Sequence, residues 1–165
     1  MKKIIFLDFD GVLNTEYYQG VLQFQGKQQR DEYGALFAPG AVRQLKRIID
    51  FTATEIVISS SWKSIGLAKI QELWMKRNLP GRVIDVTPTL HSGNKGEEIA
   101  AWLIENATPE TRYVVIDDEE VVLDSQRPFF IWTNPYEGLT EERPIWLFVF
   151  LIDKVPICSI IVLFV

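Results

Sequence analysis

The chain has 165 residues, of which 47% are hydrophobic and 24% are charged, a composition typical of a single globular domain. Its formal net charge of −5 argues against binding to an extended nucleic-acid duplex, which requires a basic surface. The single cysteine, Cys158, excludes an internal disulfide bond and suits the reducing cytoplasm, where we expect the protein to reside. His91 is the single histidine, which argues against a zinc site built from cysteines and histidines.

The first predicted element is a strand at residues 4–7, a short apolar run that suits burial on both faces of a sheet. Two acids, Asp8 and Asp10, follow directly, and Gly11 then permits a sharp turn. Two carboxylates this close repel each other unless a cation or a proton lies between them. Mg²⁺ is the natural cation, because it prefers oxygen ligands that it shares with phosphates. The alternative is an ordinary Asp-Gly turn with a solvated acid.

The segment at residues 14–38 is polar and aromatic with weak periodicity, and we interpret it as a flap or irregular hairpin over the acidic turn. The alternative is a surface loop without a role. Helices and strands alternate beyond this segment, which predicts an α/β fold with a doubly wound parallel sheet. The predicted helices begin at residue 39, include residues 67–74 and cover residues 95–106, and the predicted strands cover residues 55–58, 82–86, 113–116 and 129–132.

Polar side chains follow three of the predicted strands. The carboxyl ends of parallel strands lie at one edge of the sheet, so we expect these side chains to form one site. The three pairs are Asp8 and Asp10, Ser59 and Ser60, and Asp117 and Asp118.

These groups suit phosphoryl transfer. Asp8 would attack the phosphorus and form an aspartyl-phosphate, and Asp10 would protonate the leaving oxygen and later deprotonate the attacking water. Mg²⁺ held by Asp8 and Asp118 would screen the nucleophile from the phosphate. Lys95, at the start of a helix, would stabilise the phosphoryl oxygens, and Ser59 would donate a hydrogen bond to one of them.

Four motifs, in this order, resemble those of the haloacid dehalogenase (HAD) superfamily of phosphohydrolases. They are Asp8-Phe9-Asp10-Gly11-Val12-Leu13, Ile56-Val57-Ile58-Ser59, Lys95, and Val114-Val115-Ile116-Asp117-Asp118. The Ser59-Ser60-Ser61-Trp62 and Lys95-Gly96-Glu97-Glu98-Ile99 segments are similar to the small HAD domains associated with RNA repair proteins. The resemblance implies a HAD-like Rossmannoid sheet with strand order 5-4-1-2-3, dependence on Mg²⁺, and removal of phosphate from nucleotides or polynucleotide ends.

The resemblance also implies roles for individual acids. With Lys95, Asp8 and Asp10 would be the catalytic residues. The metal ligands would be Asp8, the main-chain carbonyl of Asp10, and Asp118, with Asp117 beside it.

The phosphate would be held by Ser59, with Ser60 and Lys63 as further contacts. The alternative for Lys63 is a solvated lysine at the start of a helix. We interpret Trp62 as an aromatic residue of the core or its rim rather than a platform for base stacking. The insertions are too short for a large cap domain, so we expect a nearly capless site.

The last segment, residues 141–165, departs from the pattern of the HAD-like domain at residues 1–140, because it is largely apolar. Apolar residues that favour a membrane span are offset by Asp153 and Lys154. Four alternatives stay open: packing against the body of the domain, which we favour, self-association with another subunit, membrane association, and an altered reading frame.

The sequence thus predicts a Mg²⁺-dependent phosphatase, with a phosphorylated molecule such as a nucleotide or a nucleic-acid end as its partner. The alternative is a non-catalytic module of the same fold that binds phosphate or regulates another protein. A third alternative is a membrane-tethered or oligomerising domain driven by the C-terminal segment.

Overall fold

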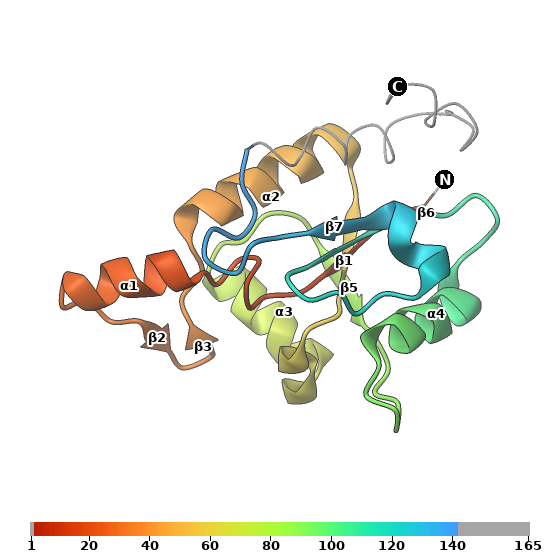
Figure 1. Cartoon of the computed structure of the whole chain (residues 1–165), viewed down its shortest axis with the longest axis horizontal. Coiled ribbons are helices and arrows are strands. Elements are labelled where there is room, and N and C mark those ends of the chain that lie inside the picture. The colour runs from red at the N-terminus through yellow and green to blue at the C-terminus, as the bar shows by residue number, and fades with distance from the viewer. Residues whose placement is uncertain (1, 142–165) are drawn as a thin grey trace.

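The computed structural model describes residues 2–141. In this part of the chain a five-stranded sheet lies between helices, and a further helix with a small hairpin projects from one end (Figure 1). The predictions for the apolar segment at residues 141–165 fall, apart from Glu141, outside the described residues. No helix among the described residues combines the length and the apolar character needed to cross a membrane.

The central strand of the sheet is β1 (Lys3–Leu7). It pairs with β4 (Glu55–Ile58) on one side and with β6 (Arg112–Asp117) on the other, and every pair in the sheet is parallel. The outer strands are β5 (Val83–Val86), beside β4, and β7 (Phe130–Trp132), beside β6. Counted along the chain, these five strands have the order 5-4-1-2-3 from β7 to β5, so the predicted fold class and strand order are confirmed.

Strand β1 is buried on both faces because its alternate side chains belong to two separate cores. Ile5 and Leu7 pack with residues of two helices on one face of the sheet, and Ile4 and Phe6 pack with residues of a third helix on the other. All four side chains are fully buried, and each such burial stabilises the fold by about 1.5–3 kcal/mol. The helices are α2 (Pro39–Thr52) and α3 (Leu67–Lys76) on the first face and α4 (Lys95–Asn106) on the second.

The segment predicted as a flap contains a helix, α1 (Glu16–Phe24), followed by an antiparallel hairpin of β2 (Arg30–Asp31) and β3 (Gly34–Ala35). Figure 1 shows α1 and the hairpin side by side, extending away from the sheet. Two 3₁₀ helices, η1 (Ser61–Ile65) and η2 (Asp124–Phe129), follow β4 and precede β7.

Helix α1 was not expected, and its composition explains why. Its apolar face is short, formed by Tyr18, Val21 and Leu22, and only Leu22 of its nine residues is buried; Gly20 in its middle also has a low helix propensity. A local signal does exist in Thr15, whose hydroxyl accepts a hydrogen bond from the backbone N–H of Tyr18 at 3.2 Å and caps the helix.

Candidate active site

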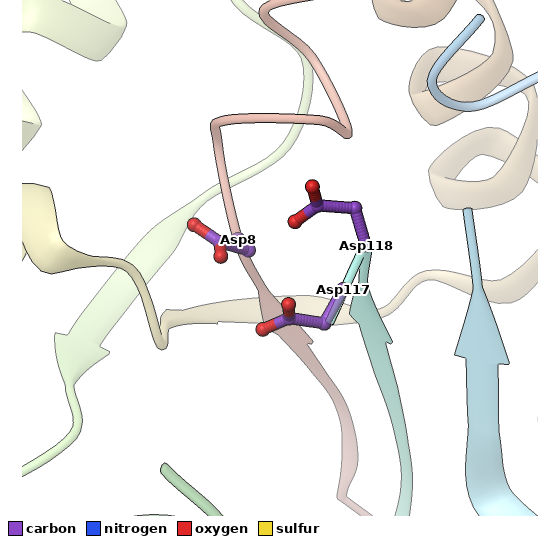
Figure 2. A group of neighbouring side chains, drawn as sticks. All are labelled: Asp8, Asp117 and Asp118. Carbon is purple, nitrogen blue, oxygen red and sulfur yellow. The ribbon is translucent and has the colours of Figure 1, made fainter. Parts of the chain in front are cut away.

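The predicted edge of the sheet gathers the polar strand ends. Leu7 pairs with Ile58 on β4 and with Ile116 on β6, so the residues that come next on these three strands lie at the same edge of the sheet. Figure 2 shows Asp8 at the end of β1 and Asp117 and Asp118 at the end of β6, on adjacent strands. One carboxylate oxygen from each of the three acids lies within 4.8 Å of the others, a separation at which they could hold a metal ion together.

Lys95 contacts two of these acids. Its ammonium group donates hydrogen bonds to Asp8 and to Asp117, the latter at 2.9 Å. Lys95 is the first residue of α4, and the side chain of Asn94 caps the helix by accepting a hydrogen bond from the N–H of Glu97 at 3.0 Å. The positive end of the helix dipole therefore adds to the charge of Lys95 at the acids.

The loop that follows Asp118 fixes the start of α4. The Gln126 side chain donates a hydrogen bond to the carbonyl of Gly96 at 2.9 Å and accepts one from the N–H of Leu123 at 2.9 Å. A Cβ atom on Gly96 would lie 2.8 Å from backbone atoms of that loop, which shows how closely the helix and the loop pack. Lys95 is thus held at a fixed position relative to Asp117 and Asp118 at the end of β6.

Burial and neighbouring charges shift the pKa values of the acids and of Lys95. Burial, and then the charge of Asp8, raise the pKa of Asp117 to about 7, and the same two causes raise the pKa of Asp118. Burial by itself would lower the pKa of Lys95, but the charges of Asp8 and Asp117 raise it on balance. When all three acids are ionised, their charges exceed that of Lys95 by two, and another cation can balance this excess.

The donor set fits Mg²⁺, which prefers hard oxygen ligands and often binds through a few carboxylates plus substrate oxygens. Gly11 allows this arrangement: a Cβ atom there would lie 2.2 Å from Cγ of Asp118, and the φ angle of +67° is one that glycine adopts without strain. The backbone of the first acidic turn can therefore approach Asp118 closely.

The two serines after β4 differ in their surroundings. Ser59 is 2% exposed, and its hydroxyl has no hydrogen-bond partner among the described residues, so it is available to a ligand. Ser60 is also buried, and its hydroxyl accepts a hydrogen bond from the N–H of Trp62 at 3.4 Å at the start of η1. Both serines thus follow β4 at the same edge of the sheet as the acids, although they are far from them in the sequence.

The structure gives Lys63, the third predicted phosphate contact, partners within the protein. Its ammonium group pairs with the buried Glu98 and donates hydrogen bonds to the Thr87 hydroxyl at 3.2 Å and to the carbonyl of Pro88 at 3.0 Å. Its side chain is only 11% exposed, so it is not the solvated lysine of the alternative interpretation. Contact between Lys63 and a phosphate stays a prediction.

Asp10, the predicted acid and base, stands apart from the three-acid group and is exposed. One of its oxygens accepts a hydrogen bond from the side-chain amide of Asn14 at 2.7 Å, and the other accepts one from the indole N–H of Trp62 at 2.9 Å. The contact with Trp62 was missed by sequence reasoning, because the two residues are separated by 52 positions and no local pattern links them.

A groove of about 530 Å³ opens beside these acids. Asp10 and Asp118 line it together with polar residues of α1. None of the described residues that line the groove is a lysine or an arginine. They are Asp10, Gly11, Asn14, Thr15, Glu16, Gln19, Gly20, Gln23, Asp118 and Pro135.

A comparison with protein families gives a match over most of the chain. The family model is described as the HAD domain in Swiss Army Knife RNA repair proteins, and it matches residues 4–143, which is most of the chain. No curated protein and no solved structure matches the chain.

Proposed function

Because the chain belongs to the family of HAD domains in Swiss Army Knife RNA repair proteins, we propose that it is a Mg²⁺-dependent phosphatase that acts through an aspartyl-phosphate. The observation that carries this proposal is the environment of Asp8, whose carboxylate lies at the end of the central strand between Lys95 and two further acids. The free hydroxyl of Ser59 beside this strand end supports a phosphate site at the same place.

In the first step, a carboxylate oxygen of Asp8 attacks the phosphorus of a phosphate monoester, and the bond from phosphorus to the ester oxygen breaks. Asp10 gives its proton to that leaving oxygen, so an alcohol departs and an aspartyl-phosphate remains. In the second step, the Asp10 carboxylate takes a proton from a water molecule whose oxygen attacks the phosphorus. This releases inorganic phosphate and restores both acids.

The other groups hold the charges in place. Lys95 would face the negative charge that builds up on the phosphoryl oxygens, and Ser59 would donate a hydrogen bond to one of them. Asp8 and Asp118, with the main-chain carbonyl of Asp10 and with Asp117 beside them, would hold Mg²⁺. When bound, Mg²⁺ supplies positive charge that reduces the repulsion between the nucleophile and the phosphate.

The groove beside Asp10 supports nucleotides or polynucleotide ends as substrates. Asp10 protonates the leaving group, so the alcohol part of the substrate must lie on its side of the site, where the groove opens. Gln23 lines that groove with an exposed side chain, and its amide matches hydroxyl groups and base edges, which form hydrogen bonds without carrying charge. The net charge of −5 favours contact with the end of a strand over contact with a long phosphate backbone.

The test is release of inorganic phosphate from p-nitrophenyl phosphate, nucleotides, 3′- and 5′-phosphorylated oligonucleotides, sugar phosphates and phosphopeptides, with Mg²⁺ and with a chelator. We expect release that the chelator and Asp8→Asn both abolish. Asp124→Asn is the matched control, because that side chain is 96% exposed on η2.

Activity that survives both the chelator and Asp8→Asn would refute the proposed mechanism. If no substrate releases phosphate, while phosphate or Mg²⁺ still raises the melting temperature, the chain is a non-catalytic binding module instead.

A further inference from the structure

Trp62 connects the projecting hairpin to the predicted acid. Its indole N–H donates a hydrogen bond to Oδ2 of Asp10 at 2.9 Å, although Trp62 belongs to η1 and Asp10 to the turn after β1. We propose that Trp62 is a positioning residue that holds the Asp10 carboxyl group in the orientation needed to protonate the leaving oxygen. This inference rests on the proposed phosphatase function.

The indole ring is itself held from several sides. It packs edge-on against Phe9 with ring centroids 5.4 Å apart and lies 5.8 Å from the ring of Phe37. The guanidinium group of Arg77 lies 5.9 Å from the centre of the indole. Gly34 on β3 lies so close that a Cβ atom there would be 2.5 Å from Cη2 of the indole. The ring therefore has little freedom to turn away from Asp10.

The hairpin that carries Gly34 is anchored to the body of the domain. Arg77, which follows α3, donates hydrogen bonds to the carboxylate of Asp31 at 2.6 and 2.9 Å and to the carbonyl of Gly34 at 3.2 Å. The side chain of Arg77 is 10% exposed and that of Asp31 is 28% exposed, so this ion pair is partly shielded from water. The hairpin thus acts as a fixed support behind the indole.

The second donor to Asp10 is also fixed in orientation. The side-chain amide of Gln19 donates hydrogen bonds to Oδ1 of Asn14 at 2.9 Å and to the carbonyl of Leu36 at 2.8 Å. The oxygen of the Asn14 amide therefore faces Gln19, and its NH₂ group faces Oδ1 of Asp10 at 2.7 Å. Two donors, one on each oxygen, define the plane of an otherwise exposed carboxyl group.

Orientation of this group is important for one part of the reaction. A positioned general acid contributes roughly 10²–10⁴-fold to a rate, and this contribution is needed when the leaving group is a poor one such as an alkyl alcohol. An activated aryl alcohol such as p-nitrophenol departs with little help from a proton. Loss of the Trp62 hydrogen bond should therefore affect the two kinds of substrate unequally.

The experiment compares kcat/KM for an alkyl phosphate and for p-nitrophenyl phosphate in full-length wild type and Trp62→Phe, which keeps an aromatic ring but removes the N–H. We expect Trp62→Phe to lower the ratio of kcat/KM for the alkyl phosphate to kcat/KM for p-nitrophenyl phosphate by about tenfold or more, which is a part of the general-acid contribution. Trp102→Phe is the matched control, because it removes an indole hydrogen bond to another carboxylate, that of Asp85 at 2.7 Å, away from Asp10. The control should keep the wild-type ratio.

A double-mutant cycle with Asp10→Asn then tests whether Trp62 acts through Asp10. In the Asp10→Asn background, Trp62→Phe should change the ratio by less than about twofold. An equal loss on both substrates, or a tenfold change that persists without the Asp10 carboxyl group, would overturn the inference while leaving the phosphatase proposal intact. Absence of phosphate release by the wild type from every substrate would refute the phosphatase proposal and this inference with it.

Discussion

Replacement of Lys95 by methionine tests how strongly the acids at the sheet edge depend on one lysine. The side chain of Lys95 is 19% exposed, and those of Asp8 and Asp117 are 7% and 1% exposed. At 2.9 Å and an effective dielectric constant of about 20, the attraction between Lys95 and Asp117 is about 6 kcal/mol before the cost of burying the charges is subtracted. Removing one partner of a buried ion pair typically costs about 3–5 kcal/mol, because the other charge stays buried.

We therefore expect the free energy of unfolding of Lys95→Met at pH 8, without Mg²⁺, to be about 3–5 kcal/mol below that of the wild type. The loss should be smaller at pH 5. The pKa of Asp117 is about 7 in the folded wild type, above its ordinary value of 3.8, so the folded chain takes up a proton there as the pH falls. A neutral Asp117 no longer needs the lysine, and the variant regains stability relative to the wild type.

Urea unfolding at the two pH values measures this difference. Lys46→Met is the control, because the ion pair of Lys46 with Asp50 is exposed and should contribute under about 1 kcal/mol. If Lys95→Met loses no more stability at pH 8 than Lys46→Met does, the acids at the sheet edge do not depend on Lys95 and the electrostatic reasoning is wrong.

Three further predictions follow from the same geometry. In the wild type without Mg²⁺, the raised pKa of Asp117 means that the folded state binds more protons than the unfolded state between about pH 4 and 7, so this group lowers the stability as the pH rises. Mg²⁺ should therefore raise the melting temperature more at pH 8 than at pH 5.5. Equal shifts at the two pH values in thermal scans would contradict this. Gly11→Ala places a Cβ atom against Asp118 and should weaken Mg²⁺ binding at least about tenfold in calorimetry, whereas unchanged affinity would exclude Asp118 from the metal site. Phe6→Ala removes a fully buried ring that packs against Trp102 at 5.3 Å and should cost about 3–5 kcal/mol, seen as a lower urea midpoint with an unchanged slope; a change below about 1 kcal/mol would mean that this core can collapse around the gap.

The fold could be predicted because its signals are local. The apolar run of residues 4–7 is short and ends in acids, which indicates a strand buried on both faces. Helix α1 gives a weaker signal. Its apolar face of Tyr18, Val21 and Leu22 spans little more than one turn, and Gly20 between them has a low helix propensity.

The strand ends that form the candidate site could be predicted from the sequence, but the contacts between side chains from different loops could not. Acids and serines that end parallel strands must meet at one edge, so Asp8, Ser59 and Asp117 could be placed together from their positions in the chain. The pairing of Lys63 with Glu98 and the hydrogen bond from Trp62 to Asp10 join residues 35 and 52 positions apart. Contacts of this kind depend on how the loops pack after the sheet has formed, and the sequence carries no local mark of them.

The excess of carboxylates over ammonium groups at the sheet edge has a consequence for the order in which ligands bind. A phosphate monoester is an anion, and with Asp8, Asp117 and Asp118 ionised beside Lys95 alone it would meet net repulsion. A divalent ion that arrives first cancels the two excess negative charges and so removes this repulsion before the ester binds. The proposed phosphatase would therefore bind Mg²⁺ before the ester, and without free Mg²⁺ the folded domain would repel its substrate by charge alone.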